Sequence, residues 1–248
     1  MNTPTNRHAG RATGRVSGKI LALAAILAVA ATGYLVSGAA AEQAVKLPPP
    51  AFDLQPGTPG AVQSTVFAGG CFWGVQAVFQ HTQGVISAVS GYAGGAAASA
   101  HYETVGSGTT GHAEAVQVKW DPSRISYGKL LQIYFSVAHD PTQLNRQGPD
   151  AGPQYRSAIF YGDVKQQEVA QRYVAQLDAA QVFPRRIVTQ LVPLNGFYPA
   201  EDYHQDYATL HPDSPYIAAF DRPKIANLKS LMPEWYRAQP VLVGRRQS

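Results

Sequence analysis

The sequence predicts an α+β fold, a two-layer sandwich with a ferredoxin-like βαββαβ core plus extra α/β elements. From Val62 onward, segments with alternating or β-branched apolar residues take turns with segments whose apolar residues recur at helical spacing. The composition supports one folded domain, because 45% of the 248 residues are hydrophobic and only 15% are charged.

The first half of the core is predicted to be a strand, a helix and two strands. We expect the first strand over residues 62–68, followed by a strand-to-helix turn at Gly69-Gly70 and a helix over residues 71–79. Residues 85–91 are β-branched and residues 114–120 alternate, so both are predicted strands. The helix carries apolar side chains at helical spacing, namely Phe72, Val75, Val78 and Phe79.

The second half repeats the pattern and extends it. Residues 126–137 form an amphipathic pattern that starts from a serine, which is a favoured N-cap residue. Residues 157–161 are predicted to be a short strand and residues 163–180 a long helix with a polar face. A further strand is expected over residues 186–192, which supplies the extra α/β elements beyond the core.

The N-terminal 41 residues are typical of an export signal. Residues 1–19 hold four basic groups and no acidic one, and an apolar run over residues 20–31 and a small-residue stretch ending at Ala41 follow. This layout predicts either a signal peptide cleaved after Ala41 or an uncleaved membrane anchor over residues 20–41. Both alternatives predict an exported protein whose domain works in the periplasm or another extracytoplasmic space.

Residues 42–60 carry five prolines and no apolar periodicity, so they are predicted to be an extended Pro-rich linker. The folded domain then spans residues 61–248. Its charge is balanced, because four of the 20 basic residues lie in the N-terminal segment and the remaining 16 face 16 acidic residues. A neutral domain lacks the basic footprint of a nucleic-acid-binding protein.

Cys71 is the only cysteine, which excludes an internal disulfide and a multi-cysteine metal site. It lies between Gly70 and Gly74, and glycines allow the backbone to approach a ligand closely. Its place at the start of a helix puts it near the positive end of the helix dipole, which favours the thiolate. These features predict a nucleophile, although a lone cysteine can also be a small buried apolar side chain.

Several blocks of the sequence together resemble the peptide methionine sulfoxide reductases that act on the S epimer of the sulfoxide. The resemblance covers roughly residues 62 to 235 in order. The matching blocks are Gly70-Cys71-Phe72-Trp73-Gly74, Gly91-Tyr92-Ala93-Gly94-Gly95, Gly111-His112-Ala113-Glu114-Ala115-Val116, His139-Asp140-Pro141, Gln154-Tyr155-Arg156-Ser157, Glu201-Asp202-Tyr203-His204-Gln205-Asp206-Tyr207 and Pro223-Lys224-Ile225.

The resemblance implies thiol-dependent reduction of methionine-S-sulfoxide, protein-bound and free, to methionine, which repairs oxidised proteins. Cys71 would attack the sulfoxide sulfur and become a sulfenic acid. That attack moves negative charge onto the sulfoxide oxygen, so the site needs donors aimed at the oxygen. The resemblance assigns this role to Glu114, acting as the acid, and to Tyr102 and Tyr155.

The resemblance also implies a substrate pocket. Phe72 and Trp73 resemble the family's pocket for the S-methyl group, and Asp150 aligns with a family aspartate near the site. An acid that stays protonated near neutral pH needs apolar surroundings, which these two aromatic residues together with Ala113 and Ala115 are expected to provide. On an alternating strand, by contrast, a glutamate at position 114 would by default face solvent.

Two other functions remain open from the residues alone. Cys71 could serve a cysteine hydrolase or acyltransferase with His139 or His204 as its base. A non-catalytic module that binds methionine-rich peptides through Phe72 and Trp73 is the second alternative. No histidine pair has the spacing of a metal site, so we predict no metal.

Regeneration of the enzyme is predicted to need an external thiol. Many family members carry one or two further cysteines that capture the sulfenic acid as a disulfide, whereas the tail over residues 240–248 of this chain has none. A small thiol or a thioredoxin-like protein would therefore reduce Cys71, with no bound cofactor. The other expected partners are oxidised proteins and peptides, and we expect a monomer.

Overall fold

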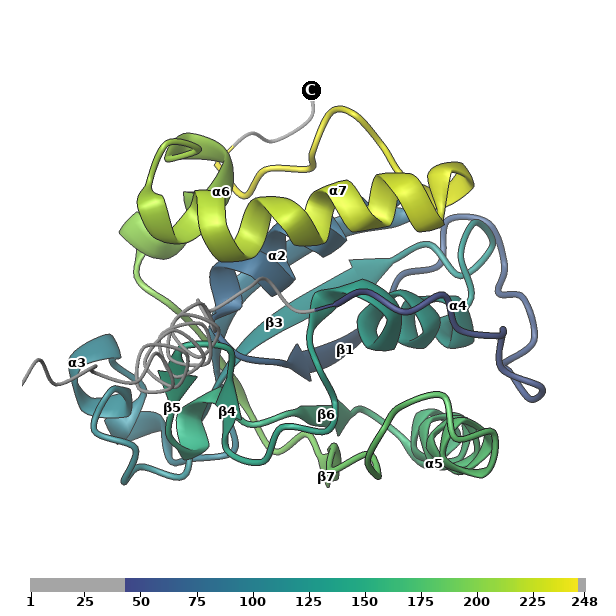
Figure 1. The fold of residues 1–248 in the computed structure, drawn as a ribbon, viewed down its shortest axis with the longest axis horizontal. Coiled ribbons are helices and arrows are strands. Elements are labelled where there is room, and N and C mark those ends of the chain that lie inside the picture. The colour runs from purple at the N-terminus through teal and green to yellow at the C-terminus, as the bar shows by residue number, and fades with distance from the viewer. Residues whose placement is uncertain (1–42, 245–248) are drawn as a thin grey trace, which may run out of the picture. The chain divides into compact units, whose positions relative to one another are not determined.

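The computed structural model describes residues 43–244 of the chain (Figure 1). The N-terminal segment predicted to be a signal peptide or anchor lies outside these residues. Within residues 43–244, no helix has both the length and the apolar character that crossing a membrane requires.

A six-stranded sheet confirms the predicted core. Its strand order is β7-β6-β1-β3-β2-β8, and β1 lies between β6 and β3, so the two halves of the βαββαβ unit interleave. The four core strands β6, β1, β3 and β2 pair with one another in antiparallel fashion. At the edges of the sheet, β7 is parallel to β6 and β8 is antiparallel to β2. The strands are β1 (Gln63–Ala68), β2 (Val85–Ala93), β3 (Ala113–Trp120), β6 (Ala158–Tyr161), β7 (Gln190–Pro193) and β8 (Phe197–Pro199), with a separate pair β4 (Arg146–Gln147) and β5 (Asp150–Ala151).

The three predicted helices are present in the predicted order, as α2, α4 and α5. Figure 1 shows α2 and α7 lying side by side on one side of the sheet, and α4 contacts α5. The helices are α2 (Phe72–Gln80), α3 (Tyr102–Val105), α4 (Tyr127–Ile133), α5 (Val164–Ala179), α6 (Tyr207–Leu210) and α7 (Arg222–Leu231), with π-helical turns at Tyr134–Ala138 and Ile217–Asp221 and 3₁₀ turns at Ala97–Ser99, Pro153–Tyr155, Asp202–His204 and Pro233–Trp235.

Two predicted boundaries differ from the structure. The helix predicted over residues 126–137 begins at the Ser126 cap, but its last turn is π-helical. The strand predicted from residue 186 begins only at Gln190. The reason is that the Ile187 and Val188 N–H groups donate to the Asp178 carboxylate and the Pro141 carbonyl, which removes them from pairing with β6.

The alternation of strand side chains divides the core between the two faces of the sheet. Phe67, Val116 and Trp120 belong to the large cluster on the helix-covered face, which also includes the apolar side chains of α2 and α4. Ala68, Phe160 and their neighbours form a smaller cluster on the opposite face. Residue 114 has the same parity as Val116, so the glutamate on β3 points toward α2.

Residues 43–60 form neither helix nor strand, and they are packed against the domain. Leu47 is buried, and the Tyr173 hydroxyl donates to the Pro48 carbonyl at 2.7 Å. The Asp53 carboxylate accepts a hydrogen bond from the Gly128 N–H at the start of α4 at 2.8 Å. The segment therefore docks on α4 and α5 and is part of the packed structure.

Candidate active site

The turn between β1 and α2 places Cys71 at the N-terminus of a helix. Gly70 has a φ of +84°, which strongly favours glycine, and a side chain there would also meet Gln147, whose Cβ lies 2.5 Å from the place of a Cβ. Cys71 is the N-cap residue of α2, has no side-chain capping hydrogen bond and is buried. The Trp73 N–H in the first turn of α2 lowers the pKa of the Cys71 thiol.

Cys71 lines a cavity of about 200 Å³. The structure brings together in it all seven side chains predicted from the sequence and adds one tyrosine that the sequence reasoning missed. The lining residues are Cys71, Phe72, Trp73, Tyr102, Glu114, Asp150, Tyr155 and Tyr216.

Glu114 lies on β3 beneath the start of α2 and is 4% exposed, so the default expectation of a solvent-facing glutamate is wrong. Its carboxyl accepts a hydrogen bond from the Phe72 N–H at 3.0 Å. Burial raises the pKa of Glu114 to about 8, with the Phe72 N–H opposing this effect and the Asp150 charge adding to it. The carboxyl is therefore protonated at neutral pH and can donate a proton.

The apolar surroundings of Glu114 differ in part from the prediction. Phe72 and Trp73 line the same cavity as the carboxyl, as expected. Ala113 and Ala115 belong to the cluster on the opposite face of the sheet, because neighbouring residues of a strand point in opposite directions. Those two alanines therefore do not surround the carboxyl.

The expectation that the helix dipole favours a Cys71 thiolate is wrong for the resting protein. Burial raises the pKa of the thiol well above its ordinary value, and the nearby Glu114, Asp221 and Asp150 raise it further. The Trp73 N–H lowers this pKa, and it does not outweigh them. Cys71 and Glu114 thus both hold a proton until a substrate arrives.

Two tyrosine hydroxyls complete the polar side of the cavity. Tyr102 begins α3, and its backbone N–H donates to the Glu201 carboxylate at 3.0 Å, which fixes the start of that helix. Tyr155 ends a 3₁₀ turn. Burial, with a further contribution from the Glu114 charge, raises the pKa of both tyrosines, so both remain O–H donors near neutral pH.

Aromatic rings form the apolar side of the cavity. The Phe72 and Trp73 ring centroids are 6.4 Å apart. Trp73 is stacked on Tyr207 with centroids 3.9 Å apart, and it meets the edge of Tyr216 at 6.0 Å. The indole is therefore held on two sides, which fixes the wall that faces Cys71.

Tyr216 is the residue that the sequence reasoning missed. Its hydroxyl donates to the Asp150 carboxylate, and both side chains line the cavity. Burial raises the pKa of Asp150, whereas the Tyr216 hydroxyl and the Lys224 charge oppose this. Tyr216 lies on neither a strand nor a helix with periodic apolar residues, so no sequence pattern indicated it.

The two histidines considered as bases for a hydrolase do not serve Cys71. Both ring nitrogens of His139 are engaged elsewhere, with the Tyr134 carbonyl at 3.3 Å and the Ser157 hydroxyl at 2.7 Å, and burial lowers its pKa to about 3. The ring nitrogens of His204 have no hydrogen-bond partner among residues 43–244. The arrangement therefore pairs the thiol with an acid instead of a base.

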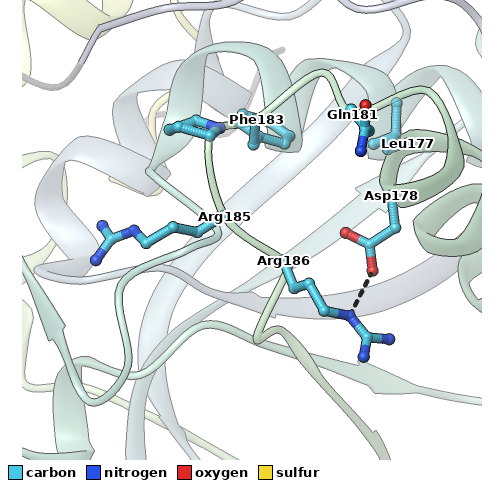
Figure 2. Close-up of a pocket in the computed structure, with 7 residues that line it drawn as sticks. Leu177, Asp178, Gln181, Phe183, Arg185 and Arg186 are labelled. Carbon is cyan, nitrogen blue, oxygen red and sulfur yellow. Dashed lines mark ion pairs between the residues drawn. The ribbon is translucent and has the colours of Figure 1, made fainter.

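A separate cavity lies at the C-terminal end of α5 (Figure 2). Phe183, Arg185 and Arg186 line it, and Arg186 pairs with Asp178 at 3.9 Å. Arg186 is 93% exposed, so this ion pair contributes little. None of the predicted site residues lies there. Within residues 43–244, no cluster of three or more His, Cys, Asp or Glu side chains could hold a metal ion.

Comparisons with known proteins agree on the family of this chain. The family model described as "Peptide methionine sulfoxide reductase" matches residues 63–235. A peptide methionine sulfoxide reductase MsrA 2 of Mesorhizobium japonicum is 60% identical over 185 residues, which cover 75% of this chain and 94% of that protein. The protein of the same name from Synechocystis sp. is 44% identical over 215 residues, which cover 86% of this chain and 99% of that protein.

Solved structures agree with these relatives. Methionine sulfoxide reductase A of Corynebacterium diphtheriae is similar with a TM-score of 0.53 and 33% identity, covering 72% of this chain and 91% of that one. Reduced Mxr1 from Saccharomyces cerevisiae has a TM-score of 0.56 and 31% identity, covering 63% of this chain and 90% of that one.

Proposed function

The chain belongs to the peptide methionine sulfoxide reductase family and is an oxidoreductase that reduces methionine sulfoxide with thiols, and we propose that Cys71, Glu114, Tyr102 and Tyr155 carry out this reaction. One observation carries the proposal. The Cys71 thiol and the protonated Glu114 carboxyl line one cavity, so a nucleophile and an acid face the same substrate.

In the proposed reaction the sulfoxide oxygen lies against Glu114, Tyr102 and Tyr155. Hydrogen bonds from these groups polarise the S–O bond and make the sulfur electrophilic, which lets the buried Cys71 thiol lose its proton as it attacks. The attack forms a bond between the two sulfurs while Glu114 protonates the oxygen. The hydroxyl then passes to Cys71, so the substrate S–O bond and the new S–S bond break, an S–O bond forms on Cys71, and the proton lost by the thiol returns to Glu114. The substrate sulfur is reduced by two electrons to the thioether of methionine, and Cys71 is oxidised to the sulfenic acid.

We further propose that only the S epimer reacts. The oxygen donors line the same cavity as Phe72 and Trp73, which supply an apolar surface for the S-methyl group. A tetrahedral sulfur of the R configuration cannot place its oxygen, its methyl group and the attacked face correctly at once. Asp150 lines the same cavity and is proposed to contact the substrate.

The proposal is tested by single-turnover reduction of the two separated epimers of N-acetylmethionine sulfoxide without thiol. We expect release of about one equivalent of N-acetylmethionine from the S epimer and none from the R epimer. Replacement of Trp73 by Ala should raise the KM for the S epimer and lower the rate, because it removes the wall around the methyl group. Equal reduction of both epimers would contradict the proposed geometry.

For the second half of the cycle we propose an external thiol. Cys71 is the only cysteine in the chain, so an intramolecular disulfide is excluded. An exported thioredoxin-like protein is the proposed donor in the cell, because glutathione is scarce outside the cytoplasm. Trapping of a mixed disulfide between Cys71 and such a protein, with its second cysteine changed to Ser, tests this assignment.

The cellular location of the protein is proposed from the sequence of residues 1–41. We propose export by this segment, as a cleaved signal peptide or as an anchor, with residues 61–248 forming a monomeric reductase domain in the periplasm. N-terminal sequencing of the mature protein distinguishes cleavage after Ala41 from retention. Recovery of full-length protein in the cytoplasm would contradict export.

A further inference from the structure

Helix α3, which carries Tyr102, depends on contacts with other parts of the protein. It is a single turn of four residues, and a helix this short is not stable without tertiary contacts. Its N-cap residue His101 makes no side-chain capping hydrogen bond, and of its four residues only Val105 is buried. The place of the Tyr102 side chain in the cavity is therefore determined by the groups that bind this turn.

The Glu201 carboxylate binds the start of α3. One of its oxygens accepts a hydrogen bond from the Tyr102 N–H at 3.0 Å, and the other accepts one from the Tyr92 hydroxyl at 2.8 Å. Burial raises the pKa of Glu201, but the hydrogen bonds that it accepts outweigh burial and lower the pKa below its ordinary value. Glu201 is therefore an ionised acceptor near neutral pH, and its hydrogen bonds are stronger than those between neutral groups.

Tyr92 connects Glu201 to the part of the sheet that carries the acid. Tyr92 is fully buried on β2 and is paired with Glu114 of β3 across the antiparallel ladder. Residues that are paired in this way point to the same face of a sheet. Hydrogen bonds thus run from the cross-strand neighbour of Glu114, through Glu201, to the backbone of Tyr102. This connection fixes the start of α3 relative to Glu114.

The segment that carries Glu201 is itself held by buried hydrogen bonds. Directly before Glu201, the Ala200 N–H donates to the Ser90 carbonyl of β2 at 2.9 Å. After it, the Gln205 side-chain amide accepts from the Ser90 N–H at 3.0 Å and donates to the Ser90 and Ala200 carbonyls at 2.9 and 3.0 Å. Glu201 is therefore anchored to β2 from both sides, so its carboxylate is a fixed point for α3.

We propose that Glu201 is a positioning residue that holds the Tyr102 hydroxyl in place for the sulfoxide oxygen. The inference rests on the proposed function, because it concerns one of the hydroxyls assigned to that oxygen. Glu201 is not among the residues that line the substrate cavity, so it acts through the backbone of Tyr102. A shift of α3 would lengthen the hydrogen bond from the Tyr102 hydroxyl, and hydrogen bonds weaken as their geometry departs from the optimum.

The test is a double-mutant cycle between Glu201 and the Tyr102 hydroxyl in the full-length protein. Single-turnover release of methionine from methionine-S-sulfoxide is measured for the wild type, Glu201→Ala, Tyr102→Phe and the double variant. Glu201→Ala should slow release at least about fivefold, because α3 loses the bond at its start. In the Tyr102→Phe background the same change should slow release less than about twofold, because the hydroxyl that Glu201 positions is already absent.

Two further variants separate positioning from charge and from general damage. Glu201→Gln should restore most of the wild-type rate, because its amide oxygen can accept from the Tyr102 N–H while its NH₂ group donates to the Tyr92 oxygen. Asp202→Ala removes a carboxylate from the exposed neighbouring position and should leave the rate unchanged. A merely structural role of Glu201 would slow release by the same factor with and without the Tyr102 hydroxyl.

Tyr92→Phe provides a second route to the cycle, in case Glu201→Ala does not fold. It removes only the hydroxyl that binds the other Glu201 oxygen, and its effect should also shrink in the Tyr102→Phe background. Equal slowing in both backgrounds, or no slowing in either, would overturn the positioning role and leave the proposed function intact. A wild-type rate in Tyr102→Phe would instead overturn the role of this hydroxyl in the proposed function, and the positioning role with it.

Discussion

Helices α2 and α5 each follow a core strand, and their first turns are built differently. Helix α5 follows β6 and begins at Asp163, whose carboxylate accepts hydrogen bonds from the Lys165 and Gln166 N–H groups at 2.8 and 2.9 Å. Helix α2 follows β1 and begins at Cys71, which makes no side-chain capping bond. The Phe72 N–H in its first turn donates instead to the Glu114 carboxyl of β3.

The comparison shows two uses of the same unsatisfied backbone donors. An exposed aspartate at a helix start satisfies the N–H groups and complements the helix dipole, so α5 is stabilised. At α2 the acceptor is buried and protonated, so it gives the helix less stabilisation. What α2 gains is a thiol and an acid held next to each other in one cavity.

The largest expected effect is at the start of α2. Cys71→Ser should reduce methionine formation to background, because a hydroxyl is a far weaker nucleophile toward sulfur and cannot form a sulfenic acid. Activity is measured with dithiothreitol as reductant, and a thermal melt confirms folding. Residual activity within about tenfold of wild type would contradict the difference between the starts of α2 and α5, since α2 would then have no chemical role.

Glu114→Gln should slow the reductase step by roughly 10² to 10⁴-fold, because the amide keeps the shape but has no transferable proton. The wild-type rate should fall as pH rises through about 8, the pKa of Glu114, because the acid form is lost. The variant should lack this decline. A silent Glu114→Gln would remove the acid from the mechanism.

Tyr102→Phe and Tyr155→Phe should each have a smaller effect. Each change removes one hydrogen bond to the oxygen, worth roughly 1 to 3 kcal/mol in the transition state. The double variant should lose more than either single one, though not the simple sum, because both hydroxyls serve the same atom. Single-turnover rates of the wild type, the two single variants and the double variant make up the double-mutant cycle that measures this coupling.

The buried acid should also lower stability at alkaline pH. The pKa of Glu114 is raised from 4.5 to about 8 by folding, so its contribution is fully present below pH 4.5 and is lost as pH rises through 8. Relative to wild type, Glu114→Gln should therefore gain about 2 kcal/mol between pH 5 and pH 8, or roughly 4 °C or more in Tm. A constant difference in Tm across that range would contradict the buried, protonated state.

The smallest effect is expected at α5. Asp163→Ala should destabilise the protein by about 1 kcal/mol through loss of the cap, with unchanged reductase activity. Asp163→Asn, which keeps a capping oxygen, should be nearly neutral and serves as the control. If Asp163→Ala impaired methionine formation as strongly as it impaired stability, the two helix starts would not have separate roles.

The sequence predicted the βαββαβ core because each core element has a clear period, as in the strand 114–120 and the helix 71–79. It also predicted which side chains gather around Cys71, through residues that resemble a family. The resemblance did not show that Glu114 points toward α2 or that Cys71 stays protonated. Those properties depend on burial, which the tertiary structure alone determines.

Other features of the structure have no signal in the local sequence. Tyr216 and Asp221 reach the site from a short helical turn and the π-helical turn that follows it, and no apolar period in the sequence places them. The docking of residues 43–60 depends on hydrogen bonds to distant groups such as the Tyr173 hydroxyl. The prediction for residues 1–41 stays a prediction, because these residues lie outside the part of the chain that the structure describes.

The most direct test of the account is the mass of the intact protein after reaction with one equivalent of methionine-S-sulfoxide and no thiol. We expect a gain of one oxygen atom on Cys71 and release of about one equivalent of methionine. A thiol-specific sulfenic acid probe should then label Cys71 in wild type and nothing in Cys71→Ser. Methionine release without any change in the mass of the protein, or with oxygen on another residue, would contradict the assignment of Cys71 as the nucleophile.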